Sequence, residues 1–335
     1  MNQTVGRTTA GRAHLLLSEH LVLALSVAYI LGIGPLVPGF ATVANLGNVT
    51  SSLLPLLVLA IGQTFVLVTG GIDLSVTAVI ALASVLGASV MTAEGGVLAG
   101  RPPAVPAAAA AMVGVGMAVG LINGVAVTRL GMPPFLVTLT TLMVCGGLAV
   151  WYTNWYAHAE AIAGLPESFL TLVGEWRVGV APYPLAIAAA VALGAHVALR
   201  HTLWGRWLYA VGLNRRAAAV SGVPAERVVT AAYVVSGACA AVGSILYTAR
   251  LETGLPDLGQ RLLLDVIAAA VLGGTSLFGG RGNITGTAAG VLFITLLDNG
   301  LNLGNLSNFQ ILIVKGLVIL LAALLDAARR RREQG

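Results

Sequence analysis

Residues 52–76 read SLLPLLVLAIGQTFVLVTGGIDLSV. The run 52–69 is apolar apart from a few uncharged polar side chains, and about 20 such residues cross a bilayer as a helix. A Gly70-Gly71 pair and Asp73 follow, and this combination ends one helix and starts another. The stretch therefore predicts a membrane helix that is broken at its end.

The composition extends this prediction to the whole chain of 335 residues. Hydrophobic residues make up 57% and charged residues 9%, whereas a soluble domain carries roughly 25% charged residues. The mean hydropathy of +0.91 agrees. The 42 glycines suit membrane helices, which use small residues to pack closely. We therefore expect an all-α polytopic membrane protein.

About ten transmembrane helices are expected, because ten apolar runs are long enough to cross the membrane. Backbone groups in lipid must bond internally, so these runs are predicted to be helices rather than open strands. The runs are 21–38, 52–69, 76–92, 105–127, 135–152, 182–199, 229–248, 263–278, 284–301 and 310–326. Together they predict a transmembrane domain over residues 20–326.

The distribution of arginine predicts the orientation. With ten spans both termini lie on one side, which then holds thirteen arginines against four on the other. The positive-inside rule places the tails 1–19 and 327–335 and the long loop 200–228 in the cytoplasm. The basic run 329–332 is expected to anchor the last span at the lipid surface. Topology thus explains the net charge of +5, and nucleic acid is not an expected partner.

The cysteines and histidines add little. Cys145 and Cys239 lie in apolar runs and are expected to be small core residues rather than a disulfide. The five histidines lack metal-ligand spacing, so no metal site is expected. The first apolar run could pass for a signal peptide, but no cleavage motif follows it, and a first span is preferred.

A weak internal repeat relates the two halves of the chain. Asn123-Gly124 leads to Phe135, and Asn299-Gly300 leads to Phe309 in a similar way. One pair ends an inward span and the other an outward span. This pattern predicts an inverted repeat of spans 2–5 and 7–10, as in many transporters.

Asp73 is the charged residue of the opening stretch. Its carboxylate can accept backbone N–H bonds and so cap the helix after the break. A compatible interpretation is that the broken helix lines a path through the membrane, because polar groups at this depth are costly unless they face a cavity. The sequence leaves both roles open.

Residues 200–227 form the longest expected cytoplasmic stretch. Ala217 to Val220 is predicted to form a short helix that Gly222 and Pro224 stop. A short helix between glycines suits docking in a groove of a partner protein. A solvated basic loop fits the pattern equally well.

Residues 273–282, GGTSLFGGRG, are too rich in glycine for a continuous helix, because each interior glycine costs about 1 kcal/mol. A phosphate-binding loop of the G-K-[ST] type is excluded, since Lys315 is the one lysine of the chain and follows Val314. The glycines therefore predict close packing and a helix break.

These segments together resemble the ribose/xylose/galactose-type permeases of bacterial ABC importers, within the branched-chain amino acid/sugar permease superfamily. The matching pieces, in the family's order over about residues 45–326, are Gly70 to Val76, Gly120 to Gly124, Pro133 to Leu139, Gly205 to Gly222 and Asp265 to Gly282. Each motif is short, but the ordered set is specific. Thr77 departs from the glycine that many relatives place there, which puts no function in doubt.

The resemblance implies a transport subunit of the bacterial inner membrane, not an enzyme. It implies a second permease copy, either identical or a close paralogue, a periplasmic sugar-binding protein, and a separate cytoplasmic ATPase. ATP would bind to that ATPase, so this chain needs no cofactor. The resemblance also assigns the ATPase-coupling loop, whose expected residues are Gly205, Gly212, Asn214, Ala217, Ala218 and Gly222.

The expected substrate is a small sugar, a pentose or hexose. Branched-chain amino acids, nucleosides or a sugar-like signal are alternatives that share the architecture. A proton-driven transporter needs titratable groups deep in the membrane, whereas the candidates lie near predicted span ends. Those candidates are Asp73, Asp265, Asp298 and Lys315.

A neutral sugar needs hydrogen-bonding groups along its path but no strong charge. Polar residues beside helix breaks could supply them, or could instead bond across helices. Phe135 could pack on a sugar face. The predicted path residues are Gln63, Asp73, Asn123, Phe135, Thr138 and Asn299.

Overall fold

The computed structural model describes residues 21–175, 177–178 and 181–334, and most of these residues are helical. The predicted all-α fold is confirmed, apart from two-residue strands that pair antiparallel, β1 (Arg177–Val178) and β2 (Ala181–Pro182). Helix Leu21–Ile33 comes first. The elements that follow are α2 (Val43–Val68), α3 (Val76–Met91), α4 (Ala104–Thr128), α5 (Pro134–Ala157), α6 (Glu167–Phe169), the π-helix η1 (Leu170–Glu175), α7 (Tyr183–His201), α8 (Leu203–Leu213), α9 (Arg215–Val220), α10 (Ala225–Leu251), α11 (Leu262–Leu272), α12 (Ile284–Leu303) and α13 (Asn308–Gln334).

Six helices of the described chain are long and apolar enough to cross a membrane: α2, α4, α5, α7, α10 and α12. Four shorter apolar helices, Leu21–Ile33, Val76–Met91, Leu262–Leu272 and Asn308–Leu321, coincide with the other four predicted runs. A helix therefore lies at each of the ten predicted positions. The number of membrane crossings stays a prediction.

Helix α11 is much shorter than the run 263–278 predicted. It ends at Leu272, and Gly274 follows with a φ of 90°. Its 11 residues rise about 16 Å, roughly half of the 30 Å hydrocarbon core. The run was hydrophobic enough to continue, but the two adjacent glycines favour a turn over another helical turn.

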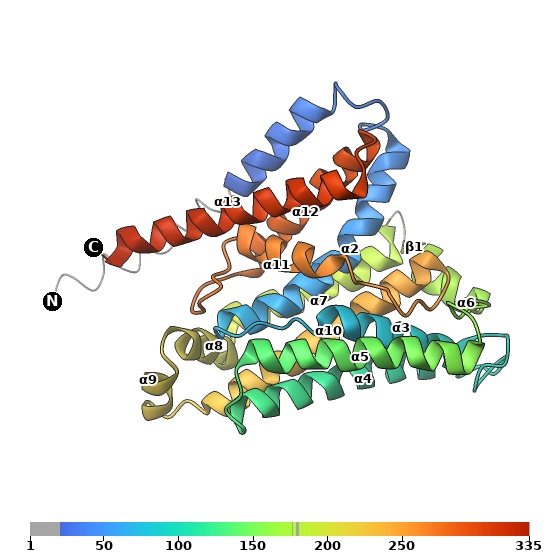
Figure 1. Ribbon diagram of the computed structural model, residues 1–335, viewed down its shortest axis with the longest axis horizontal. Coiled ribbons are helices and arrows are strands. Elements are labelled where there is room, and N and C mark those ends of the chain that lie inside the picture. Colours follow the sequence, from blue (N-terminus) through green and yellow to red (C-terminus); the bar gives the residue numbers. More distant parts are fainter. Residues whose placement is uncertain (1–20, 176, 179–180, 335) are drawn as a thin grey trace.

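Helix α10 is the central packing element, in contact with α2, α3, α4 and α8. Figure 1 shows α3, α4, α5 and α10 running side by side. The α4–α10 contact is the tightest, because glycines at 116, 120 and 124 of α4 meet the α10 backbone near Gly237, Tyr233 and Thr230. Small residues at four-residue spacing let the two backbones touch.

The two ends of the bundle carry different elements. In Figure 1, α8, α9 and the C-terminal end of α13 lie toward one end, and α6 and β1 lie at the other. This arrangement agrees with the prediction that the loop 200–228 and the C-terminal tail lie on the same side of the membrane. Sidedness itself stays a prediction.

We expect Gly116→Ala to destabilise the protein, whereas Gly114→Ala on the same helix is harmless. A Cβ at 116 would clash with the Gly237 carbonyl and lie 2.9 Å from the Ala241 Cβ, while a Cβ at 114 meets open space. Overpacking of this kind costs about 1–3 kcal/mol. Thermal unfolding of detergent-purified protein, followed by circular dichroism, should show a lower midpoint for Gly116→Ala alone. Equal midpoints for both variants would contradict the α4–α10 contact.

Candidate functional site

The break after α2 is a buried non-helical segment. Helix α2 ends at Val68, Gly70 adopts a φ of 80°, and the next helix begins at Val76. A Cβ at Gly70 would come within 3.4 Å of the Phe278 carbonyl oxygen, so the loop 273–283 packs directly on the break. Left-handed backbone and close packing both favour glycine here.

Asp73 is 2% exposed, and both oxygens of its carboxyl group accept hydrogen bonds. Oδ1 accepts the Ser75 N–H at 3.0 Å and the Ser75 hydroxyl at 2.6 Å, while Oδ2 accepts the Ser236 hydroxyl at 2.8 Å. Ser75 is the N-cap of α3. Asp73 therefore accepts a backbone N–H as predicted, but the N–H is that of the N-cap residue rather than of the first helical turn.

The same network reaches α4 and α5. Asn123 donates from Nδ2 to the Ser75 hydroxyl oxygen at 2.9 Å and accepts the Thr141 hydroxyl at 2.7 Å. The Ile72 carbonyl accepts the hydroxyls of Thr138 and Tyr233, both at 3.3 Å. Side chains from α4, α5 and α10 thus hold the break in one position.

Three of the predicted path residues, Asp73, Asn123 and Thr138, therefore come together. Their partners Thr141 and Ser236 were missed by the sequence reasoning. A usable signal existed, because Thr141 lies three residues after Thr138, and helical residues three apart share a face.

Gln63 is fully buried, and within the described chain neither Nε2 nor Oε1 has a hydrogen-bond partner. The contacts of Gly62 and Thr64, its neighbours on α2, indicate where the Gln63 side chain points. Gly62 packs on Cys239 of α10, and the Thr64 hydroxyl bonds that of Thr287 on α12 at 2.8 Å. At 100° per residue, Gln63 points between α10 and α12. An unsatisfied buried polar group costs about 1–3 kcal/mol, so its presence calls for an explanation.

The other two predicted path residues lie elsewhere. Asn299 exchanges amide hydrogen bonds of 2.8 and 2.9 Å with Asn45, near the start of α2. Asn45 is about 35 Å from the end of α2, at 1.5 Å per residue. Phe135 is 53% exposed at the start of α5. The structure therefore does not gather the predicted path residues at one point.

The predicted coupling loop forms two helices. Helix α9 begins at Arg215, two residues earlier than predicted, because Asn214 caps it by accepting the Ala217 N–H at 3.0 Å. Gly222 ends the turn with a φ of 82°, as the sequence indicated. Ala218 packs inward, but Val220 is 91% exposed. Apolar side chains on a short protruding helix are a surface suited to a partner protein.

Helix α8 connects α9 to the broken segments. Gly212 of α8 packs against the Val68 carbonyl at the end of α2, and the same carbonyl accepts the Gly280 N–H at 2.9 Å. A Cβ at Gly279 would lie 2.8 Å from the Gly70 nitrogen and 2.9 Å from the Gly212 oxygen. Three backbone segments therefore meet through glycine, a contact we call the glycine junction (Gly70, Gly212, Gly279 and Gly280).

Tyr209 adds a side-chain tie to the glycine junction. Its hydroxyl donates to the Gly282 carbonyl at 2.7 Å. Burial raises the pKa of Tyr209 to about 12, against a smaller opposing effect of Arg200. Gly205, at the other end of α8, packs against the backbone of Leu199 and lets α8 turn back on α7.

The chain is similar to known transport permeases along most of its length. A family model described as "branched-chain amino acid transport system / permease component" matches residues 45–323. The ribose import permease protein RbsC of Escherichia coli K12 is 36% identical over 328 residues, covering 97% of this chain and 98% of the relative. RbsC of Bacillus subtilis is 39% identical over 292 residues, 86% of each protein. The galactose/methyl galactoside import permease protein MglC of Haemophilus influenzae is 31% identical over 305 residues, covering 89% and 90%. No solved structure matches the chain.

Proposed function

The chain belongs to the family of branched-chain amino acid transport system permease components, and we propose that it is the membrane-spanning permease subunit of an ABC importer for a small sugar, a pentose or hexose. The observation that carries this proposal is the similarity, along almost the whole chain, to permeases named for sugar import. The protein is a multi-pass protein of the inner membrane and, like these relatives, a transport subunit. Sugar is favoured over a branched-chain amino acid because the relatives' names specify ribose and galactose.

The proposed assembly holds this chain, a second permease copy, a cytoplasmic ATPase and a periplasmic sugar-binding protein. ATP binds to the ATPase, in keeping with the missing G-K-[ST] sequence in this chain. Ten membrane crossings with both termini in the cytoplasm fit the arginine distribution. The common location of α8, α9 and the end of α13 supports this orientation.

Two of the ten proposed crossings, those of α3 and α11, combine a short helix with a non-helical segment. The segments 70–75 and 273–283 adjoin α3 and α11 at the proposed membrane depth. Most residues of the first segment and about half of those of the second are buried in protein. Irregular backbone at membrane depth is tolerated where protein covers it or where it lines a cavity. This is the setting in which transporters place their substrate paths.

Coupling to the ATPase is proposed to run through α9. Its exposed Val220 and the neighbouring Leu213 offer apolar surface to a groove in the ATPase. Movement of α9 would pass through α8 and the glycine junction to the end of α2 and the break. The hydrogen bonds of Asp73 then carry it to α4, α5 and α10.

Gln63 is the proposed path residue with unused hydrogen-bonding capacity. Its amide supplies both donors and an acceptor, which a sugar hydroxyl can match. Asp73, Asn123 and Thr138 already form hydrogen bonds within the network around the break, and they would hold the break beside the path. Asn299 and Phe135 would each contribute at one end of the path. The inverted repeat stays a proposal of the sequence.

We expect cells that express the chain with its cognate ATPase and binding protein to accumulate a radiolabelled sugar. The probes are D-ribose, D-galactose and D-allose, with L-leucine as the alternative substrate. Uptake of at least one sugar should disappear when the permease is omitted. Permease-dependent uptake of L-leucine with no sugar uptake would overturn the proposed function.

We expect Gly222→Val to uncouple ATP hydrolysis from sugar uptake while membrane insertion is unchanged. The left-handed φ of 82° costs an L-residue about 1–2 kcal/mol, and a β-branched residue more. Gly222→Asn is the matched control, since Asn tolerates this conformation. Uptake and ATPase activity of the reconstituted complex are measured together. Normal uptake by Gly222→Val would show that this loop is not the coupling element.

We expect Gln63→Cys to react with a small aqueous thiol reagent, in a background without Cys145 and Cys239, at rates that differ between nucleotide-free and ATP-bound complexes. A path residue becomes wet in one state of the cycle, whereas a packed residue stays dry in both. Ile61→Cys, also fully buried on α2, is the unreactive control. If position 63 stays unreactive in both states of a transporting complex, the path lies elsewhere.

A further inference from the structure

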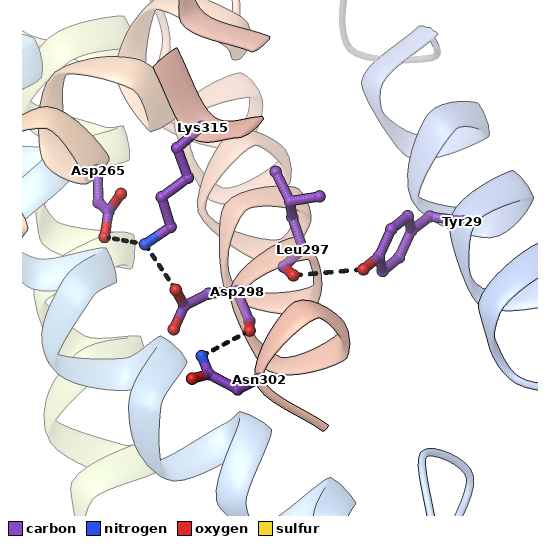
Figure 2. A network of polar contacts seen from close by, with 6 residues as sticks. All are labelled: Tyr29, Asp265, Leu297, Asp298, Asn302 and Lys315. Carbon is purple, nitrogen blue, oxygen red and sulfur yellow. Dashed lines mark hydrogen bonds and ion pairs between the residues drawn. The ribbon is translucent and has the colours of Figure 1, made fainter. Parts of the chain in front are cut away.

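Three charged side chains converge from three helices in a bundle whose helices α2 to α5 carry no charge at all. Lys315 of α13 places its Nζ 2.9 Å from Oδ2 of Asp265 on α11 and 2.6 Å from Oδ1 of Asp298 on α12. Figure 2 shows the lysine lying between the two carboxylates. We call these residues the charged triad (Asp265, Asp298 and Lys315).

Packing alone does not explain the charged triad, because burying ionisable groups costs free energy. Apolar residues of similar size replace a buried ion network at no loss, or with a gain, of stability. Ionisable groups at membrane depth therefore point to function. The triad also holds two carboxyl groups against a single ammonium group.

Asp298 is the member of the charged triad whose carboxylate can accept further hydrogen bonds. The side chains of Lys315 and Asp265 are 11% and 10% exposed, whereas that of Asp298 is 43% exposed. Its Oδ1 contacts the lysine, and in the described part of the chain its Oδ2 accepts no hydrogen bond. A half-exposed carboxylate at this depth is too costly against lipid and must face water or another polar surface.

The position of the triad along the helices is also informative. Asp298 lies five residues before the end of α12 and Lys315 seven residues after the start of α13, about 8 and 10 Å from helix ends that share the connection 304–307. This is the end opposite the cytoplasmic one in the proposed orientation. The triad therefore lies slightly inside the end of the bundle that faces outward in the proposed orientation.

A polar stripe on α12 leads past this position. Thr295, Asp298, Asn299 and Asn302 follow one another at the spacing of one helix face. Asn302 is exposed at the end of the helix and donates to the Asp298 carbonyl at 2.7 Å (Figure 2). Thr295, one turn deeper, is 5% exposed, and its hydroxyl has no partner among the described residues. The stripe thus runs from the surface to an unsatisfied polar group in the interior.

We propose that Asp298, held in place by Lys315, is a sugar-binding residue of the outer half of the path, together with Asn302 above it and Thr295 below it. Its free Oδ2 accepts hydroxyl hydrogen bonds from a neutral polyhydroxylated substrate, and charge-assisted bonds of this kind are the stronger ones. Lys315 is a positioning residue, which fixes the carboxylate of Asp298 through their contact. This inference rests on the proposed sugar-import function and adds a binding site to it.

The test uses the complete importer in membranes, in a background without Cys145 and Cys239. Asp298→Cys and Asn302→Cys are each treated with a membrane-impermeant thiol reagent from outside, with and without the sugar that the wild type takes up best among D-ribose, D-galactose and D-allose. Bound sugar slows the reaction by a factor of 1 + [sugar]/Kd, about tenfold at nine times Kd. The L-enantiomer of that sugar should leave the rate unchanged.

Leu317→Cys is the matched control. Leu317 is 56% exposed and lies about 200° around α13 from Lys315, so its thiol should face lipid and stay unreactive. Asn302→Cys leaves the charged triad intact, so it tests the site even where Asp298→Cys misfolds. No reaction at 298 and 302, disulfide bonding between two permease copies at 298, or reaction that the transported sugar does not slow would each overturn the site. Wild type that takes up none of the three sugars would instead overturn the proposed function.

Discussion

The buried carboxylate of Asp73 is the constraint on which the rest of the structure depends. A carboxyl group 2% exposed inside an apolar bundle is tolerable only when it is hydrogen-bonded, and here its partners are Ser75 and Ser236 of α10. Those bonds fix the break between α2 and α3 against the central helix. The tight α4–α10 glycine contact then determines where Asn123 can meet Ser75.

Glycine performs two separate tasks in this fold. Along α4 and α10 it brings two helices into backbone contact, which lipid itself does not drive. At the glycine junction it lets α8, the end of α2 and the loop 273–283 touch without side chains between them. A contact made of backbone has little room to yield, so a displacement of α8 has to move its neighbours.

The helices and the local turns could be predicted well from the sequence, whereas the side-chain contacts between helices could not. The break at Gly70-Gly71 and the left-handed Gly222 follow from local conformational preference, so both were predictable. The early end of α11 was predicted in part, because the glycines of 273–282 indicated a helix break although the hydrophobic run 263–278 suggested a longer helix. Asp265, Asp298 and Lys315 stood out singly as charged residues near span ends, but their convergence depends on how α11, α12 and α13 pack, and no local pattern encodes that.

Helix α2 relates the two ends of the molecule. Its last residue, Val68, contacts the glycine junction, whereas Asn45 near its start pairs with Asn299, the neighbour of Asp298. The two contacts lie about 35 Å apart along one helix. Pro55 lies between them and removes one backbone hydrogen bond, which makes this the place where the helix bends most easily. The two ends are thus mechanically connected, and a bend at Pro55 would let them move by different amounts, as alternating access to the proposed path requires.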